Sequence, residues 1–184
     1  PPRSTLFPYT TLFRSGIRTI DDIYRILNAG ADKVSINSIS LENSSFITKA
    51  SSVFGSQCIV CSIDVKKINN TYKVFSKSKG LLDIHPLLLA KQYQEYGAGE
   101  ILLTSVDHEG STNGYDINLI KLFKDELKIP VILNGGMGEP IHAVEAIQNG
   151  ADAIAAAYIF HFSQYTPKDI RNKLAEYNIS VRII

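Results

Sequence analysis

The sequence has little cysteine, no excess of charge of either sign and no long apolar run, and each absence excludes a class of protein. Its 184 residues include 19 Lys and Arg against 18 Asp and Glu, so there is no basic field for nucleic acid or an anionic membrane surface. No apolar run approaches the roughly 20 residues that cross a bilayer, and no signal-peptide pattern opens the chain. We therefore expect a soluble cytoplasmic protein whose partners are small molecules or another protein, with neither nucleic acid nor membrane among them.

The two cysteines, Cys58 and Cys61, form a C-x-x-C pattern that redox pairs and zinc sites share. Both lie in a strand-like run, where a spacing of three residues puts the side chains on opposite faces. No second Cys or His pair stands at the spacing that a tetrahedral site needs. We predict two reduced thiols in the core, no metal ion and no cofactor.

Short apolar runs alternate with amphipathic helix patterns along most of the chain. The strand-like runs cover 33–37, 58–64, 100–104, 131–135 and 153–157, and the helix patterns cover about 23–27, 43–54, 84–96, 117–127, 140–149 and 167–177. Polar residues 66–79 predict a long loop, with a β-ribbon around 72–75 as an alternative. This alternation is typical of parallel βαβ units.

Residues 1–15 do not fit this pattern, because they show neither helical nor strand periodicity and end abruptly against a well-patterned segment. The stretch 5–15 resembles the translation of a common sequencing adapter. We interpret 1–15 as a foreign leader and assign 16–184 to one domain.

An internal repeat sharpens the fold prediction. Gly16 precedes the run Gly30-Ala31-Asp32 by 14 residues, and 120 residues later Gly136 precedes Gly150-Ala151-Asp152 by the same distance. The repeat indicates either a recurring αβ corner or two related half-barrels, and the matching helix faces favour the second. We predict an incomplete (β/α)₈ barrel with five or six of its eight βα units, since a whole barrel takes about 250 residues.

In such a barrel the working residues lie at the carboxyl ends of the strands. Asp64 ends an apolar strand there and is a candidate general acid or base. The glycine turn with Gly135 and Gly136 precedes a helix, an arrangement that favours an anion such as phosphate. Because the repeat places Gly16, Asn37 and Ser38 at positions equivalent to Gly136, Ala157 and Tyr158, we predict two phosphate sites and a substrate with phosphates at two ends.

Several motifs resemble the cyclase subunit of imidazole glycerol phosphate synthase, over residues 16–182. The motifs are Gly30-Ala31-Asp32-Lys33-Val34-Ser35-Ile36-Asn37-Ser38, Phe54-Gly55-Ser56-Gln57, Ser62-Ile63-Asp64-Val65-Lys66, Gly97-Ala98-Gly99-Glu100-Ile101-Leu102-Leu103-Thr104-Ser105, Gly114-Tyr115-Asp116 and Ile159-Phe160-His161-Phe162. The resemblance implies a lyase of histidine biosynthesis. In that reaction ammonia from a glutamine amidotransferase (glutaminase) subunit converts a bisphosphorylated phosphoribulosyl formimino aminoimidazole carboxamide ribonucleotide into imidazole glycerol phosphate and aminoimidazole carboxamide ribonucleotide.

The resemblance also implies roles for single residues. Asp64 matches one of the family's two catalytic aspartates, and Lys33 and Glu100 match charged residues at the amino-terminal end of the barrel, where ammonia is admitted. The matches to the two phosphate sites are Gly16, Asn37 and Ser38 for one, and Glu109, Gly110, Gly136, Ala157 and Tyr158 for the other.

This sequence departs from the family at several site positions. Glu109, His108 and Tyr158 replace the usual Asp, Arg and small hydroxyl residue, and Asn134 and Met137 are also unusual. These changes resemble a paralogous branch of surface-polysaccharide biosynthesis, which modifies an amidino-type sugar with an amidotransferase. A non-catalytic half-barrel that binds phosphate, and another phosphate-binding barrel such as a sugar-phosphate isomerase, stay open as alternatives.

The family's other catalytic aspartate, on the first strand of the barrel, has no counterpart before Gly16. We therefore expect the amino-terminal part of the barrel to be missing from this chain. The chain alone should be inactive, and its open strand edges should make it aggregate or dimerise.

Overall fold

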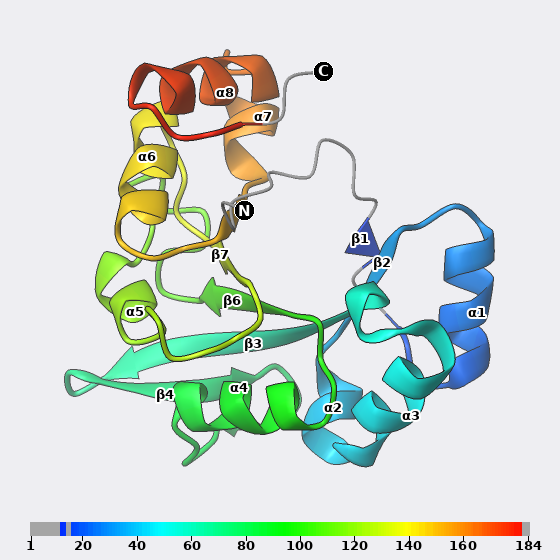
Figure 1. The fold of residues 1–184 in the computed structure, drawn as a ribbon. Coiled ribbons are helices and arrows are strands. Elements are labelled where there is room, and N and C mark those ends of the chain that lie inside the picture. The colour runs from blue at the N-terminus through cyan, green and yellow to red at the C-terminus, as the bar shows by residue number, and fades with distance from the viewer. Residues whose placement is uncertain (1–11, 14–15, 182–184) are drawn as a thin grey trace.

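The computed structural model describes residues 12–13 and 16–181 as an α/β fold built on one curved sheet (Figure 1). Its strands are β1 (Leu12–Phe13), β2 (Lys33–Ile36), β3 (Ile59–Ile68), β4 (Thr71–Ser76), β5 (Gly80–Leu81), β6 (Glu100–Ser105), β7 (Val131–Asn134) and β8 (Ala153–Ala155). Its helices are α1 (Ile20–Asn28), α2 (Ser38–Glu42), α3 (Ser45–Phe54), the 3₁₀ turn η1 (Ser56–Cys58), α4 (Pro86–Glu95), α5 (Ile117–Lys121), α6 (Pro140–Gln148), α7 (Tyr158–Phe162) and α8 (Pro167–Glu176).

The predicted parallel sheet is confirmed. Six strands pair in parallel in the order β1-β2-β3-β6-β7-β8, and β4 and β5 attach to β3 as an antiparallel ribbon. Among the described residues no pairing joins β8 to β1, so the sheet is an open part of a (β/α)₈ barrel. The helices lie outside it, with α1, α2 and α3 at one end and α5, α6 and α8 at the other (Figure 1).

Side chains of alternate residues in each strand lie on opposite faces of the sheet. One set packs under the helices in the hydrophobic core: Val34, Ile36, Ile59, Cys61, Ile63, Val65, Ile101, Leu103, Val131 and Leu133. The strand register places the other set on the concave face, in three layers. The layer at the amino-terminal ends is Ser35, Val60 and Glu100; the middle layer is Ser62, Leu102, Ile132 and Ala153; the layer at the carboxyl ends is Asp64, Thr104, Asn134 and Ala155. The concave face is therefore polar at both ends, unlike the core.

The 120-residue repeat is visible in the structure. Helices α1 and α6 begin 120 residues apart and have the same length, and α2 and α7 are related in the same way. Both corners close with equivalent bonds, from the backbone N–H of Gly30 to Leu27 O and of Gly150 to Ile147 O, each within about 3.1 Å. The repeat is thus one of whole helix-to-strand units, and not of isolated glycines.

Several predicted boundaries are wrong for local reasons. The helix predicted at 43–54 is α3, which begins at Ser45, because Asn43 is extended and its side chain accepts a hydrogen bond from Ser45. The helix predicted at 117–127 ends at Lys121, where i→i−3 bonds tighten the following turns. The polar segment 66–79 forms the ribbon that was the alternative prediction. The short helices α2 and α7 were not predicted.

Two earlier interpretations meet the structure only in part. Cys61 is buried in β3, but Cys58 is half-buried in η1 rather than in the strand, and both thiols are free. Within the interpreted leader, Leu12 and Phe13 pair with β2. The other residues of 1–15 lie outside the described residues, and their foreign origin stays a prediction.

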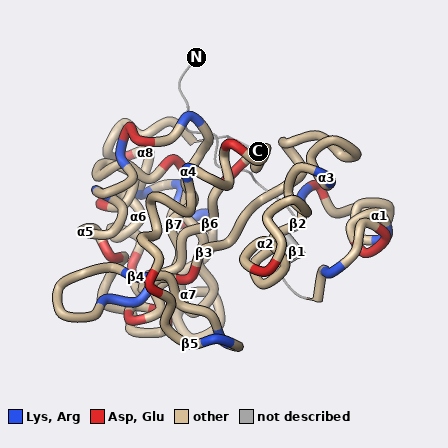
Figure 2. The backbone as a smooth tube through the Cα atoms, turned by 90° about the horizontal axis from the view of Figure 1, so that it is seen from below, with Lys and Arg blue, Asp and Glu red and all other residues tan. Residues whose placement is uncertain are grey.

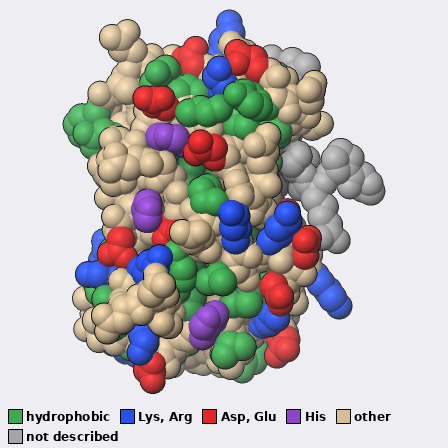
Figure 3. Space-filling view, turned by 90° about the vertical axis from the view of Figure 1, so that its left-hand side faces the viewer, with side chains coloured by type: hydrophobic (Ala, Val, Ile, Leu, Met, Phe, Trp, Pro, Cys, Tyr) green, Lys and Arg blue, Asp and Glu red, His purple; other side chains and the backbone are tan. Residues whose placement is uncertain are grey.

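The surface agrees with the balanced charge of the sequence. The face over α5, α6 and the ribbon shows acidic and basic side chains intermixed (Figure 3). Five lysines nevertheless lie in the ribbon segment 65–82 without an acidic residue, and basic segments are visible along it in Figure 2.

No described helix is long and apolar enough to span a membrane.

Candidate functional site

A cavity of about 470 Å³ lies at the carboxyl ends of the strands. It is lined by Gly16, Ile17, Arg18, Ser35, Ile36, Asn37, Ser38, Ile39, Glu42, Asp64, Phe75, Ser76, Lys77, Val106 and Glu109. Five residues predicted from the sequence therefore line one cavity, which we call the pocket: Gly16, Asn37, Ser38, Asp64 and Glu109. They come from segments up to 93 residues apart, and the parallel sheet brings them together.

Asp64 occupies the centre of the site because β3 ends its apolar run there. Its side chain lies on the concave face, and the residue is only 8% exposed. The side-chain amide of Asn37 donates from Nδ2 to Asp64 Oδ2 over 3.0 Å. A carboxylate held in this way can take up or release a proton with one oxygen oriented by a neutral amide.

The layer around Asp64 continues across the sheet. Thr104 is the register partner of Asp64 on β6, and Asn134 is the partner of Thr104 on β7. Asn134 donates from Nδ2 to Thr104 Oγ1 over 3.2 Å. Neutral hydrogen-bonding groups thus flank the carboxylate on the concave face, a setting suited to a polar ligand.

Lys33 and Glu100 form a buried ion pair at the opposite, amino-terminal ends of β2 and β6. Their side chains are 11% and 7% exposed. A buried charge needs a partner, and here each residue supplies one for the other. The two residues meet in the structure, whereas their predicted part in admitting ammonia stays a prediction.

Of the second predicted phosphate site, only Glu109 lines the pocket. None of Gly110, Gly135, Gly136, Ala157 and Tyr158 lines it. Ala157 precedes α7, and the ring of Tyr158 packs on Phe162 with 4.5 Å between centroids and is 42% exposed. Whether these residues bind phosphate stays a prediction.

Close packing accounts for two glycines of this second set, Gly135 and Gly136. Gly135 and Gly136 have φ of 99° and 105°, a region that favours glycine. A Cβ at Gly135 would lie 2.8 Å from the carbonyl oxygen of Ser105, and one at Gly136 would collide with that of Gly114. The glycine turn is therefore required by the approach of the loop 106–116, whatever it binds.

Sequence reasoning missed several residues of the pocket. Ser35 lies between Lys33 and Asn37 on the same face of β2. Its hydroxyl is buried and has no hydrogen-bond partner among the described residues. The period of two along β2 contained the signal for it. Ser76 and Lys77 belong to the ribbon and also line the pocket. No local sequence pattern indicates that the ribbon lies beside the pocket.

No group of three or more His, Cys, Asp or Glu residues that could hold a metal ion occurs in the part of the chain that the structure describes. Asp64 and Glu109 are the predicted acidic residues of the pocket. The chemistry that the arrangement itself offers is proton transfer and hydrogen bonding.

The fold is an open part of a (β/α)₈ barrel, and the pocket lies at the carboxyl ends of its strands. The family described as "Histidine biosynthesis protein" matches residues 9–166, and the chain belongs to this family. A Campylobacter jejuni protein with the provisional name imidazole glycerol phosphate synthase subunit hisF2 is 56% identical over 169 residues, covering 92% of this chain and 68% of that protein. The imidazole glycerol phosphate synthase subunit HisF of Leptospira biflexa is 45% identical over 172 residues, covering 91% and 68%.

Proposed function

We propose that this chain is the cyclase subunit of an imidazole glycerol phosphate synthase. In this reaction ammonia attacks the bisphosphorylated phosphoribulosyl formimino aminoimidazole carboxamide ribonucleotide, which gives imidazole glycerol phosphate and aminoimidazole carboxamide ribonucleotide. The observation that carries the proposal is the oriented carboxylate of Asp64 in the pocket, bonded to Asn37. The similarity to subunits that carry this name supports it.

In the proposed mechanism Asp64 transfers protons at the reacting end of the substrate, and Asn37 fixes the orientation of its carboxylate. Gly16 and Ser38 line the same pocket and would hold a phosphate there, with the cations of Arg18 and Lys77 also in its lining. Phosphate at this end would place the reacting carbon atoms over the concave face. The second phosphate would lie toward Gly110, Gly136 and Tyr158.

A glutaminase partner would supply the ammonia, since the relatives are named as subunits. Lys33 and Glu100 lie at the end of the sheet opposite the pocket and would mark where ammonia enters. Between them and Asp64 the concave face carries the hydroxyl groups of Ser35 and Ser62. This polar path would suit a small neutral molecule that forms hydrogen bonds.

The test uses the chain as printed and a restored chain, in which the amino-terminal segment of the Campylobacter relative precedes Gly16. Ammonium chloride replaces the glutaminase, and chromatography follows both products. We expect turnover by the restored chain and none by the printed chain, because removing one member of an acid–base pair costs about 10²–10⁴ in rate. Failure of the restored chain to form imidazole glycerol phosphate would overturn the proposal.

The decisive variant in the restored chain is Asp64→Asn, which keeps the shape of the side chain and removes its charge. We expect it to lose turnover by a factor of at least about 10². The matched control is Asp83→Asn, because Asp83 is an exposed carboxylate that pairs with Lys73 outside the pocket. Equal turnover in the two variants would remove Asp64 from the mechanism.

The paralogous branch of surface-polysaccharide biosynthesis is a second candidate. It is favoured by His108, which bonds to Ser105 within the loop that carries Glu109, where the family usually has arginine. A restored chain that uses ammonia but leaves the histidine-pathway ribonucleotide unchanged would support this candidate, as would neighbouring genes for sugar modification.

A further inference from the structure

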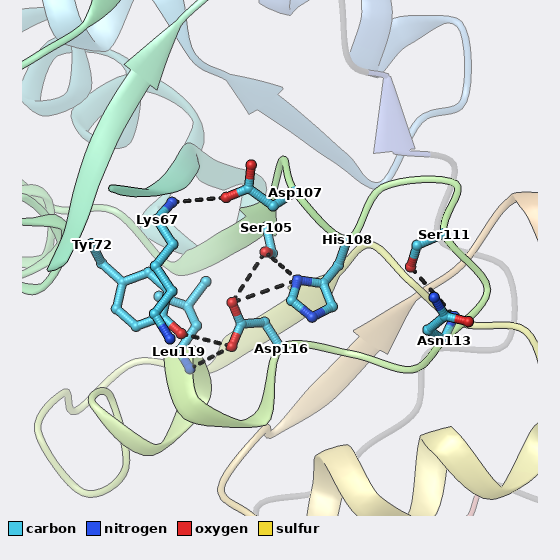
Figure 4. Close-up of polar contacts among 9 residues, drawn as sticks. All are labelled: Lys67, Tyr72, Ser105, Asp107, His108, Ser111, Asn113, Asp116 and Leu119. Carbon is cyan, nitrogen blue, oxygen red and sulfur yellow. Dashed lines mark hydrogen bonds and ion pairs between the residues drawn. The ribbon is translucent and has the colours of Figure 1, made fainter. Parts of the chain in front are cut away.

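Four side chains form one hydrogen-bonded cluster beside the pocket, which we call the brace: Tyr72, Ser105, His108 and Asp116 (Figure 4). Its centre is Asp116, which is 5% exposed and caps the amino terminus of α5. Tyr72 donates from its hydroxyl to Asp116 Oδ1 over 2.8 Å, and the backbone N–H of Leu119 donates to the same oxygen over 3.0 Å. A buried carboxylate needs such donors.

Asp116 Oδ2 can only accept, and this determines which atoms donate in the bonds among Asp116, Ser105 and His108. Ser105 donates its single hydroxyl hydrogen to Asp116 Oδ2 over 3.3 Å. Ser105 Oγ is then the acceptor for His108 Nδ1, which lies 3.0 Å away. The proton of a neutral His108 therefore belongs on Nδ1, which is also 3.6 Å from Asp116 Oδ2, and the ring is held on one side.

The brace connects two walls of the pocket. Tyr72 lies on β4, and the same ribbon provides Phe75, Ser76 and Lys77 to the pocket lining. The other three members of the brace flank Glu109, which lines the pocket from the loop 106–116. The backbone N–H of Glu109 donates to the carbonyl oxygen of Ser105 over 3.1 Å. Glu109 is therefore hydrogen-bonded directly to a member of the brace.

A second tie joins the same two walls. The backbone N–H of Lys67, on β3 before the ribbon turns, donates to Asp107 Oδ2 over 2.8 Å. The Lys67 ammonium also lies 5.3 Å from the centroid of the Tyr72 ring. Burial and the bond to Asp116 raise the pKa of Tyr72, so its hydroxyl keeps the hydrogen that it donates.

We infer that the brace is a positioning device, which fixes the ribbon against the loop 106–116 and thereby sets where Glu109 lies in the pocket. Its members do not line the pocket, so they act on a ligand through Glu109. The inference rests on the geometry of the pocket and uses the proposed function only in the choice of a ligand probe.

The test compares Tyr72→Phe with the unaltered 184-residue chain. The variant keeps the ring and removes one donor to a buried carboxylate. We expect hydrogen–deuterium exchange in residues 106–114 to become about tenfold faster, with exchange in α6 and α8 unchanged. Asp116→Asn, which keeps a good N-cap residue, should act in the same direction. The matched control is Tyr24→Phe, since Tyr24 is 59% exposed on α1.

Binding of imidazole glycerol phosphate provides a readout that general destabilisation would not reproduce. We expect Tyr72→Phe to weaken binding about tenfold in the unaltered background and much less in a Glu109→Gln background, because the brace acts through Glu109. Unchanged exchange in 106–114, faster exchange throughout the chain, or equal losses of affinity in both backgrounds would each overturn the inference. If neither the unaltered chain nor the restored chain binds the probe, the proposed function fails, while the exchange measurement still decides the positioning role.

Discussion

Asn37 donates a hydrogen bond to Asp64 over 3.0 Å, which joins the end of β2 to the end of β3 inside the pocket. The two residues are 27 positions apart, and the parallel register of β2 and β3 brings them together. Such a bond orients a carboxylate without placing a second charge beside it, which is the part that the proposed mechanism gives to Asn37.

We expect Asn37→Ala in the restored chain to lower turnover by at least about tenfold, because a hydrogen bond to a charged group contributes about 1.5–3 kcal/mol. The measurement is kcat with ammonium chloride as nitrogen source. Asn118→Ala is the control, since Asn118 is exposed on α5. Equal rates for the two variants would contradict a role for Asn37 in orienting Asp64.

The ion pair of Lys33 and Glu100 leads to a prediction about stability. Glu100→Leu leaves the lysine buried without this partner, and we expect a loss of about 3–5 kcal/mol in the free energy of unfolding. The double variant with Lys33→Met should recover most of that loss, because it removes both charges. Urea unfolding measures both. A double variant as unstable as the single one would show that packing, and not the charge, determines the loss.

The strand ends, the repeat and the cavity residues Asn37, Asp64 and Glu109 could be predicted from sequence because strands impose a period of two and parallel strands end together. The contact of Tyr72 with Asp116 could not, since it joins positions 44 apart on an antiparallel ribbon and a helix cap. Polar ribbons and polar loops have similar amino-acid compositions. For this reason the position of Lys77 in the pocket could not be predicted either. The sequence also could not decide whether the glycine turn binds a second phosphate, because packing requires the same glycines.

The helix caps predict a dependence on pH. The backbone N–H of Arg18 and the contacts with Thr19 lower the pKa of Asp22, and the contacts with Thr166 lower the pKa of Asp169. A lowered pKa in the folded state means that the ionised carboxylate stabilises the fold. This contribution is complete above the unfolded value of about 3.9 and is lost as the pH falls through the lower folded value.

We therefore expect α1 and α8 to lose helicity below about pH 4, and the variant with Asp22→Asn and Asp169→Asn to lose less on acidification. Far-ultraviolet circular dichroism between pH 6 and pH 2 measures this. Asp21→Asn is the control, because Asp21 is in the same first turn but the capping box uses Asp22. Identical acid titrations of the cap variant and the unaltered chain would contradict the prediction.

The two thiols should differ in reactivity. Burial raises the pKa of Cys61, and only the thiolate is a strong nucleophile. Cys58 is half-buried at the end of η1. We expect iodoacetamide at pH 8 to modify Cys58 in the folded chain and Cys61 only after unfolding, as measured by peptide mass spectrometry with a Cys58→Ser variant as control. Equal labelling of both would show that β3 opens readily.

The open sheet predicts self-association of the printed chain. Within the described residues β8 pairs only with β7, and its three residues are half-exposed. An unpaired strand edge is a template for pairing with another chain. We expect light scattering after size exclusion to show dimers or larger species whose fraction rises with concentration, and a monomer for the restored chain, in which a further strand covers the edge. Ala155→Lys on this edge should reduce association of the printed chain, because charged edge residues oppose pairing. A monodisperse monomer over a hundredfold range of concentration, about 1 to 100 μM, would contradict this account, since aggregation through unpaired strand edges occurs at μM to mM concentrations.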